Sequence, residues 1–208
     1  RKNSNSAEIL ISVNYAFEKR GNDMNNKNDV IERVLVSEQE IKDTVSRLAD
    51  EINEVYENSQ KALLVICILK GSVVFFSDLI RKIKVPLKID FMQVSSYGSN
   101  TVSCGNVNLR LDLQTKDLSE YNLLVIEDIL DSGNTLSCIL KYLSAKGAQD
   151  MKLCTLLDKP DRRKVPIDVD FHGVIIPDEF VVGYGLDYDE KYRELPYIGV
   201  LKPEVYQN

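Results

Sequence analysis

The sequence has no tryptophan and a single histidine, His172, among its 208 residues. Its four cysteines, Cys67, Cys104, Cys138 and Cys154, are widely separated and form no CxxC pair. This spacing excludes the usual zinc-ligand motifs and a disulfide framework, and it predicts reduced thiols in a cytoplasmic protein. His172 has no nucleophile or paired acid beside it in the sequence, so we expect it to be structural.

The sequence also lacks an excess of basic residues and any long apolar run. Lys and Arg number 26 against 32 Asp and Glu, which gives a formal net charge of −6. This acidic balance argues against a general affinity for nucleic acid or an anionic membrane. No apolar run approaches the ~20 residues of a membrane span. We therefore expect neither partner, and any phosphate-binding site must be local.

The two ends of the chain differ in composition. Residues 1–29 are rich in Asn, Ser and Lys, and we expect them to form a polar, disordered extension. An apolar patch at residues 9–17 lacks the cleavage site of a signal peptide. Residues 30–208 are enough for one domain with a substantial core.

Apolar runs in this domain predict strands that are covered on both faces. Residues 62–69, ALLVICIL, are apolar at nearly every position, and residues 87–94 and 151–157 follow as further strands. Ser37, followed by two glutamates, predicts a capped helix start before an amphipathic stretch. We predict the α/β class, with a mostly parallel sheet flanked by helices.

Residues 121–147 carry the most informative pattern. The apolar run 123–126 predicts a buried strand that ends at two carboxylates, Glu127 and Asp128. A turn containing glycine follows at residues 131–135, and then apolar residues at helical spacing. Backbone N–H groups at such a helix start predict a phosphate cradle. Two carboxylates repel a phosphate, so they need sugar hydroxyls or a divalent cation as partners.

Residues 125–136, VIEDILDSGNTL, closely resemble the phosphoribosyl-diphosphate (PRPP) signature of the type I phosphoribosyltransferases. Residues 177–193, PDEFVVGYGLDYDEKYR, and the DKP at 158–160 narrow the resemblance to the bacterial-type hypoxanthine and hypoxanthine-guanine branch. The resemblance runs from about Ile31 to Tyr206. It implies the type I phosphoribosyltransferase fold, with a small hood and a mobile β flap over the site.

The resemblance also implies an activity in purine salvage. The expected reaction is the magnesium-dependent transfer of the phosphoribosyl group of PRPP to hypoxanthine, and to guanine, which gives IMP or GMP and pyrophosphate. Family members are commonly dimers or tetramers, so we expect a homodimer or homotetramer.

Matching positions receive roles in binding PRPP. The resemblance assigns the 5-phosphate to residues of the turn: Asp131, Ser132, Gly133, Asn134 and Thr135. Glu127 and Asp128 would take the ribose hydroxyls, directly or through magnesium. Asn134 stands where some relatives carry lysine. We expect this difference to affect phosphate binding little, because the loop binds largely through its backbone.

The diphosphate end of PRPP has its own expected residues. Lys70, Gly71 and Arg193 would face the diphosphate, with Asp187 near a second magnesium ion. In the family the peptide of this Lys-Gly pair can be cis. Ser96 and Tyr97 match the flap that shields the reaction from water.

The purine base is assigned to a further group of residues. Asp131 would accept or steer the proton of purine N7, as a catalytic residue. Lys159 offers only donors, which suits the O6 of a 6-oxopurine, and the Val181 carbonyl would accept from N1–H. Phe180 would stack on the ring, and Asp187 is also counted with the purine-binding residues. The basic run that follows, residues 161–164, is interpreted as a solvated turn.

Two other functions stay open on the sequence. A regulator that senses PRPP would keep the fold and the cradle but bind nucleic acid, and the acidic composition counts against it. Retention of Asp131, Lys159, Asp187 and Arg193 also counts against it, because a sensor needs only the cradle. The other is a phosphoribosyltransferase for a different base. Orotate lacks the fused ring for which Phe180 and Lys159 are suited. Xanthine differs from hypoxanthine and guanine only at C2, so it remains possible.

Overall fold

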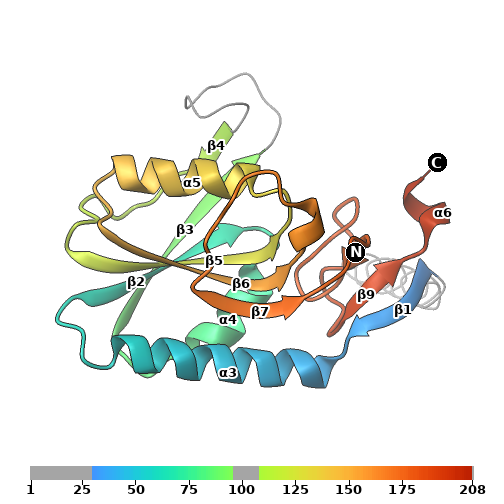
Figure 1. Cartoon of the computed structure of the whole chain (residues 1–208), viewed down its shortest axis with the longest axis horizontal. Helices are drawn as coiled ribbons and strands as arrows, with labels where there is room; N and C mark the ends of the chain where they lie inside the picture. The colour runs from blue at the N-terminus through green and yellow to red at the C-terminus, as the bar shows by residue number, and fades with distance from the viewer. Residues whose placement is uncertain (1–29, 96–107, 208) are drawn as a thin grey trace, which may run out of the picture.

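The structure is a computed structural model that describes residues 30–95 and 108–207 (Figure 1). The predicted extension at residues 1–29 and the predicted flap residues Ser96 and Tyr97 lie outside the described residues. Among the described residues, no helix is both long and apolar enough to cross a membrane.

A six-stranded sheet forms the body of the protein. Its strands are β2 (Ala62–Leu69), β3 (Leu87–Ser95), β4 (Asn108–Leu111), β5 (Tyr121–Leu130), β6 (Asp150–Asp158) and β7 (Phe171–Ile175). They lie in the order β4-β3-β2-β5-β6-β7, and every neighbouring pair is parallel except β3 with β4. The mostly parallel sheet predicted from the apolar runs is therefore confirmed.

Helices cover both faces of this sheet (Figure 1). α3 (Glu38–Tyr56) and α4 (Val73–Ile80) lie on one face, and α5 (Asn134–Ala145) lies on the other. α3 begins at Ser37, as predicted, in a capping box: the Glu40 N–H donates to Ser37 Oγ, and the Ser37 N–H donates to the Glu40 carboxylate. The box satisfies two backbone donors that the helix itself leaves unpaired.

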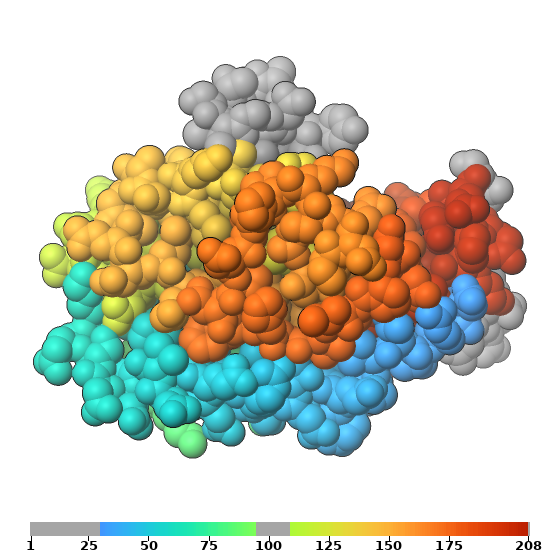
Figure 2. Space-filling model, viewed as in Figure 1, coloured from blue at the N-terminus to red at the C-terminus, as the bar shows by residue number. Residues whose placement is uncertain are grey.

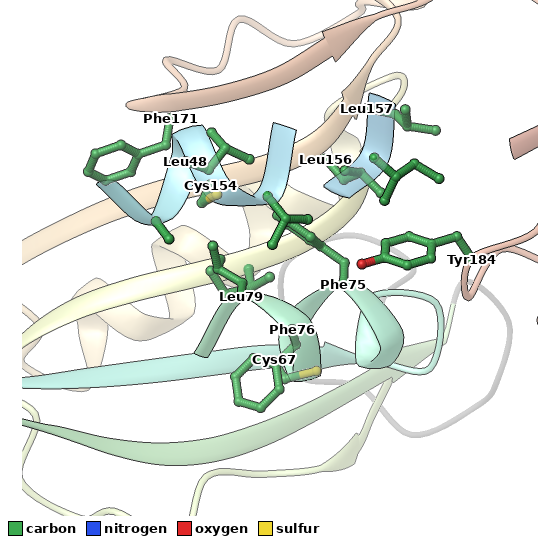
Figure 3. Packing of buried hydrophobic residues seen from close by; sticks show 14 of the residues in the cluster. Leu48, Cys67, Phe75, Phe76, Leu79, Cys154, Leu156, Leu157, Phe171 and Tyr184 are labelled. Atoms are coloured by element: carbon green, nitrogen blue, oxygen red, sulfur yellow. The ribbon is translucent and has the colours of Figure 1, made fainter. Parts of the chain in front are cut away.

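Alternation along the strands divides the core into two clusters. In β2, Val65 and Cys67 belong to the cluster under α3 and α4, whereas Leu64 and Ile66 belong to the cluster under α5. Figure 3 shows Phe75 of α4 at the centre of the first cluster, with the Tyr184 ring pointing toward it. Burial on both faces explains the continuous apolar runs of the parallel strands.

A smaller antiparallel sheet stands apart from the main one. It contains β1 (Ile31–Val36), β9 (Ile198–Leu201) and β8 (Val181–Val182), in that order, and α6 (Pro203–Tyr206) follows β9. The parallel strands of the main sheet point toward this small sheet (Figure 1), which packs directly against the body (Figure 2). We identify it as the predicted hood.

The order of the strands in the sheet changes direction between β2 and β5. After β2 the chain continues to β3 on one side, whereas β5 and β6 lie on the other side. Ligands bind in open α/β sheets outside the carboxyl ends of the strands at such a switch point. The arrangement predicts a site next to the ends of β2 and β5.

β5 is longer than the sequence predicted. The expected strand ended at residue 126, yet β5 continues to Leu130. Its pairing with β2 stops at Ile126, opposite Cys67, but its pairing with β6 continues through Glu127 and beyond. The two carboxylates are thus held on a strand edge that β2 leaves uncovered, which an apolar pattern could not reveal.

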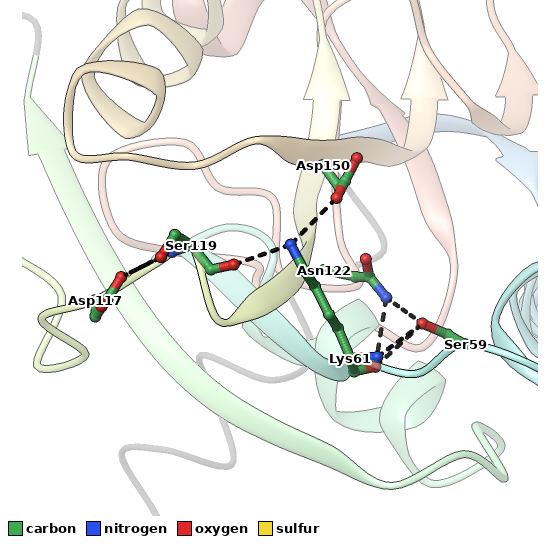
Figure 4. A network of polar contacts seen from close by, with 6 residues as sticks. All are labelled: Ser59, Lys61, Asp117, Ser119, Asn122 and Asp150. Atoms are coloured by element: carbon green, nitrogen blue, oxygen red, sulfur yellow. Dashed lines mark hydrogen bonds and ion pairs between the residues drawn. The ribbon is translucent and has the colours of Figure 1, made fainter.

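Polar contacts tie the opposite, amino-terminal edge of the sheet together (Figure 4). Lys61, just before β2, donates to the Ser119 carbonyl oxygen at 3.0 Å and lies 3.5 Å from the Asp150 carboxylate of β6. Asn122 of β5 donates to Ser59 Oγ at 2.6 Å. These bonds join the starts of three adjacent strands.

Candidate active site

The turn after β2 packs directly against an acid of β5. A Cβ atom added at Gly71 would lie 1.6 Å from Asp128 Oδ2, so any larger residue would have to displace the Asp128 carboxylate. The Leu69–Lys70 peptide is cis, one bond earlier than the Lys-Gly peptide considered from the sequence. The Lys70-Gly71 turn and the acidic pair predicted separately therefore form one site.

The acidic pair is electrostatically unfavourable in the free protein. Burial, together with the neighbouring Asp128 charge, raises the pKa of Glu127 well above its usual range. Burial also raises the pKa of Asp128 to about 6, against the opposing effect of hydrogen bonds and the Arg193 charge. Glu127 Oε2 is buried and has no hydrogen-bond partner. Both groups would gain from a ligand that supplies donors or positive charge.

The turn at residues 131–135 has the geometry of an anion cradle. Gly133 has a left-handed φ of 82° and α5 begins immediately after it, at Asn134. The first backbone bond of the helix runs from the Ser137 N–H to the Gly133 carbonyl at 2.8 Å. The N–H groups of the preceding helical residues therefore have no carbonyl partner in the helix and point out of its positive end. The predicted strand, turn and helix are confirmed here.

Three charged residues predicted for the diphosphate end meet around one unpredicted acid. Glu190 lies 2.8 Å from Lys70 Nζ and 3.0 Å from Arg193 Nη2. Arg193 also pairs with Asp187 at 2.8 Å. The Lys70 ammonium, followed by Arg193, lowers the pKa of Glu190 to about 2. The network brings Lys70, in the turn after β2, together with residues of the 184–193 segment.

A pocket of about 560 Å³ opens beside the turn, and its lining includes Ile129, Asp131, Lys159, Phe180 and Val181. Lys159 is buried and donates to the Glu179 carbonyl oxygen at 2.6 Å. Burial lowers the pKa of Lys159 from its usual value, with the Asp131 charge acting in the opposite direction. The pocket thus brings together Asp131 and three of the predicted purine-binding residues, Lys159, Phe180 and Val181. The fourth, Asp187, does not line it and pairs with Arg193 instead.

Phe180 has an aromatic neighbour that the sequence did not indicate. Its ring stacks on Tyr206 of α6, with centroids 4.8 Å apart and planes 21° from parallel. The Tyr188 ring meets it edge-on at 5.6 Å. Phe180 remains 37% exposed, so part of the ring is open to a ligand in the pocket.

The basic run after β6 is largely exposed, as expected for a solvated turn, but two of its members also contact the cradle. Arg162, at the end of the short 3-10 helix η1 (Pro160–Arg162), lies 3.1 Å from Asp131. Arg163 donates to the Asp131 carbonyl oxygen at 3.1 Å and pairs with Asp158. The fold places these arginines against the cradle, although nothing in a run of basic residues indicates where it will pack.

The site offers oxygen ligands for a cation without enclosing one. In residues 30–95 and 108–207 there is no group of three or more His, Cys, Asp or Glu side chains that could hold a metal by itself. Magnesium often uses one or two carboxylates and takes its remaining ligands from substrate phosphates and water. The raised pKa values of Glu127 and Asp128 and the unpartnered Glu127 oxygen fit that donor set.

His172 does not line the pocket beside the turn. It lies on β7, half-exposed, with Nδ1 3.6 Å from the Asp158 carboxylate. The sequence showed no acid beside it because Asp158 comes from the neighbouring strand.

Sequence reasoning missed Arg162, Glu190 and Tyr206, as well as the apolar pocket residues Ile129 and Leu186. For Arg162, one signal was present: it follows Lys159 closely at the carboxyl end of a parallel strand. Glu190 and Tyr206 carry no comparable signal, because their partners lie far away in the sequence.

Comparisons with known proteins agree with this geometry. Residues 34–189 match the family model described as phosphoribosyl transferase domain. The chain is 50% identical over 178 residues to the hypoxanthine-guanine phosphoribosyltransferase of Bacillus subtilis, covering 86% of this chain and 97% of that protein.

A solved structure and a longer relative extend the comparison. The crystal structure of a hypoxanthine phosphoribosyltransferase from Staphylococcus aureus has a TM-score of 0.80 at 46% identity, covering 87% of this chain and 97% of that one. The bifunctional protein TilS/HprT of Listeria monocytogenes is 48% identical over 176 residues, but the match spans only 27% of its length.

Proposed function

Since the chain belongs to the phosphoribosyl transferase domain family, we propose that it is a hypoxanthine-guanine phosphoribosyltransferase. It would transfer the 5-phosphoribosyl group of PRPP to hypoxanthine or guanine and release pyrophosphate. The proposal rests on one arrangement above all: a pocket containing Asp131, Lys159 and Phe180 opens next to an anion cradle and an acidic pair.

PRPP would lie along the carboxyl edge of the sheet. The N–H groups at the start of α5, which have no carbonyl partner in the helix, suit its 5-phosphate, and Glu127 and Asp128 suit its ribose hydroxyls. Lys70 and Arg193 would take the diphosphate, with the Gly71 backbone against it. The Lys70–Glu190–Arg193 network supports this role, because a carboxylate already occupies the space between the two cations.

The reaction breaks the bond between the anomeric carbon and the diphosphate and forms one to purine N9. Positive charge develops on the ribose in the transition state, and carboxylates near the sugar stabilise it. Asp131, whose carboxylate can accept from an N–H donor, would receive or steer the N7 proton as the purine attacks.

Base choice would follow from donors and acceptors in the pocket. The Lys159 ammonium donates to O6 of a 6-oxopurine but would face another donor in adenine. The Val181 carbonyl would accept from N1–H, and Phe180 would stack on the ring system. Lys159 is already oriented by its bond to the Glu179 carbonyl, which supports a fixed position for the ammonium.

We propose magnesium as the cofactor, held by Glu127, Asp128 and Asp187 together with the substrate. A bound magnesium ion neutralises the diphosphate and so makes it a better leaving group. Asp187 is held in position by Arg193 and by the Glu190 N–H at 2.9 Å. We further propose that the enzyme works in the cytoplasm as a homodimer or homotetramer, as expected for this family.

The test is an assay of pyrophosphate release. Purified protein is mixed with magnesium and PRPP, and then with hypoxanthine, guanine, xanthine or adenine in separate reactions. We expect release with hypoxanthine and guanine and none with adenine, and chelation of magnesium should stop the reaction. Xanthine tests the alternative substrate that the sequence left open.

Two outcomes would contradict the proposal. Release with none of the four bases, together with binding of PRPP, would favour a PRPP-sensing regulator. Release with adenine at a rate similar to hypoxanthine would contradict the assigned contact between Lys159 and O6.

A further inference from the structure

Arg162 links two sides of the pocket beside the turn. Its Nε lies 3.1 Å from Asp131 Oδ1, and its Nη1 lies 3.5 Å from Asp178 Oδ1. Asp131 belongs to the turn after β5, whereas Asp178 lies two residues before Phe180. The guanidinium therefore connects the proposed proton acceptor to the segment that carries the purine-stacking ring.

The backbone around Arg162 is fixed to the same turn. The Val165 N–H donates to the Ser132 carbonyl at 3.1 Å, and Arg163 Nε donates to the Asp131 carbonyl at 3.1 Å. The Arg162 N–H donates in turn to the Lys159 carbonyl at 3.2 Å. These bonds make η1 and the turn after β5 one structural unit, so Arg162 approaches Asp131 from a defined position.

Stability alone does not account for this ion pair. The side chains of Arg162 and Asp131 are 51% and 40% exposed, and exposed pairs of this kind contribute little to folding. The ion pair matters more for the orientation of the Asp131 carboxylate than for stability. Arg162 engages one carboxylate oxygen, and the other remains open to a ligand. A guanidinium keeps its charge at any pH at which the enzyme works, so Arg162 does not lose this contact by deprotonation.

The other cations near Asp131 have different roles. Lys159 feels the Asp131 charge, but its ammonium donates to the Glu179 carbonyl. Arg163 contacts the Asp131 backbone and directs its guanidinium to Asp158. Among the described residues, the side-chain carboxylate of Asp131 forms an ion pair only with Arg162.

We propose that Arg162 is a positioning residue for Asp131: it orients the carboxylate so that the second oxygen faces N7 of the bound purine. The inference rests on the proposed function and deepens it by naming the residue that prepares the proton acceptor. Arg162 itself touches neither the sugar nor the reacting atoms in this role.

The experiment compares Arg162→Gln with Lys164→Gln. Both variants remove one positive charge from the same basic run, but the exposed Lys164 side chain makes no hydrogen bond or ion pair with the described residues. For Arg162→Gln we expect kcat to fall about tenfold or more. This is part of the rate enhancement of about 10²–10⁴-fold that general acid–base catalysis typically contributes. The KM values for PRPP and hypoxanthine should change by less than about threefold. Lys164→Gln should keep kcat within about twofold.

Asp131→Asn provides the readout that a merely structural role would not move. If Arg162 acts through Asp131, Arg162→Gln should lower kcat by less than about twofold when Asp131 is already Asn. An equal loss in both backgrounds would overturn the proposal, as would equal effects of Arg162→Gln and Lys164→Gln.

A crystal structure of Arg162→Gln separates this inference from the proposed function. We expect the Asp131 carboxylate to rotate away from the orientation that Arg162 imposes. An unchanged carboxylate would overturn the positioning role even if the enzyme were active. A rotated carboxylate would support it even if the parent protein released no pyrophosphate with any base.

Discussion

At the scale of single residues, the site contains buried charge that the free protein stabilises poorly. Asp128 lies against Gly71, and burial raises the pKa of its carboxyl to about 6. The unfolded chain has an ordinary aspartate, which loses its proton near pH 3.8. Between these two pH values the folded protein binds more protons than the unfolded chain. Stability therefore decreases as the pH rises through this window.

Asp128→Asn should stabilise the magnesium-free protein above pH 6, because the amide has no charge to bury. We expect a gain in Tm of roughly 6–12 °C at pH 7.5, from a pKa raised by about two units, about 1.4 kcal/mol per unit and 2–4 °C per kcal/mol. The gain should shrink toward pH 4, where the aspartic acid is neutral too. Thermal unfolding at several pH values measures this dependence.

Asp168 offers a matched control, because its side chain is exposed and makes no hydrogen bond or ion pair with the described residues. Asp168→Asn should leave Tm within about 1 °C across the same pH range, as expected for a surface substitution. A gain from Asp128→Asn that is equal at pH 4 and pH 7.5 would show that burial of charge is not its cause.

At the scale of elements, α5 has a left-handed glycine at each end. Gly133 precedes the helix with φ 82°, and Gly147 follows it with φ 97°. A Cβ at Gly133 would lie 2.8 Å from the Val165 carbonyl oxygen, whereas a Cβ at Gly147 meets nothing within 4 Å. The start of the helix is therefore constrained by the segment that carries Arg162, and its end is not.

Gly133→Ala should raise the KM for PRPP by about tenfold or more, because the cradle must shift to relieve the contact with Val165. Gly147→Ala carries a similar backbone strain of about 1 kcal/mol at its positive φ. It should lower Tm slightly and leave the KM within about twofold. Steady-state kinetics with varied PRPP, together with thermal unfolding, distinguish the two effects.

The Gly147 variant also defines the contrary result. If both alanine variants raised the KM for PRPP equally, general loosening of α5 would explain the loss, and the close approach at Gly133 would have no special importance.

At the scale of the whole molecule, the amino-terminal and carboxyl-terminal edges of the sheet have different roles. Polar side chains tie the amino ends of β2, β5 and β6 to one another (Figure 4). The carboxyl ends of the same strands carry Lys70, the acidic pair and Lys159, and the hood lies beyond them (Figure 1). The order of the strands thus brings residues from three distant segments to one edge.

Removal of residues 1–29 should leave the enzyme intact, because residues 30–207 contain all the described strands and core clusters, and the composition of 1–29 predicts a disordered extension. Val30 should be kept, since its carbonyl accepts a hydrogen bond from the Lys202 N–H at 2.9 Å. We expect kcat and both KM values within about twofold and Tm within about 2 °C of the full chain. Loss of activity or of cooperative unfolding in the shortened chain would contradict this expectation.

The sequence alone determined the elements whose signal is local. The apolar run of β2, the capping box of α3 and the strand, turn and helix at residues 121–147 each depend on neighbours within a few positions. The cradle could be predicted for the same reason, because Gly133 and the first N–H groups of α5 are adjacent in the chain. The two-residue β8 was missed because it is too short to show any periodicity.

Only the tertiary structure decided which side chains meet. Arg162 and Asp131 are 31 residues apart, and Lys70 and Glu190 are 120 residues apart. Polar side chains on loops can pair with many partners, and the choice depends on which strand ends the sheet brings together. The sequence therefore determined the chemistry available at each strand end, while the packing of the strands and the hood determined how those groups combine into one site.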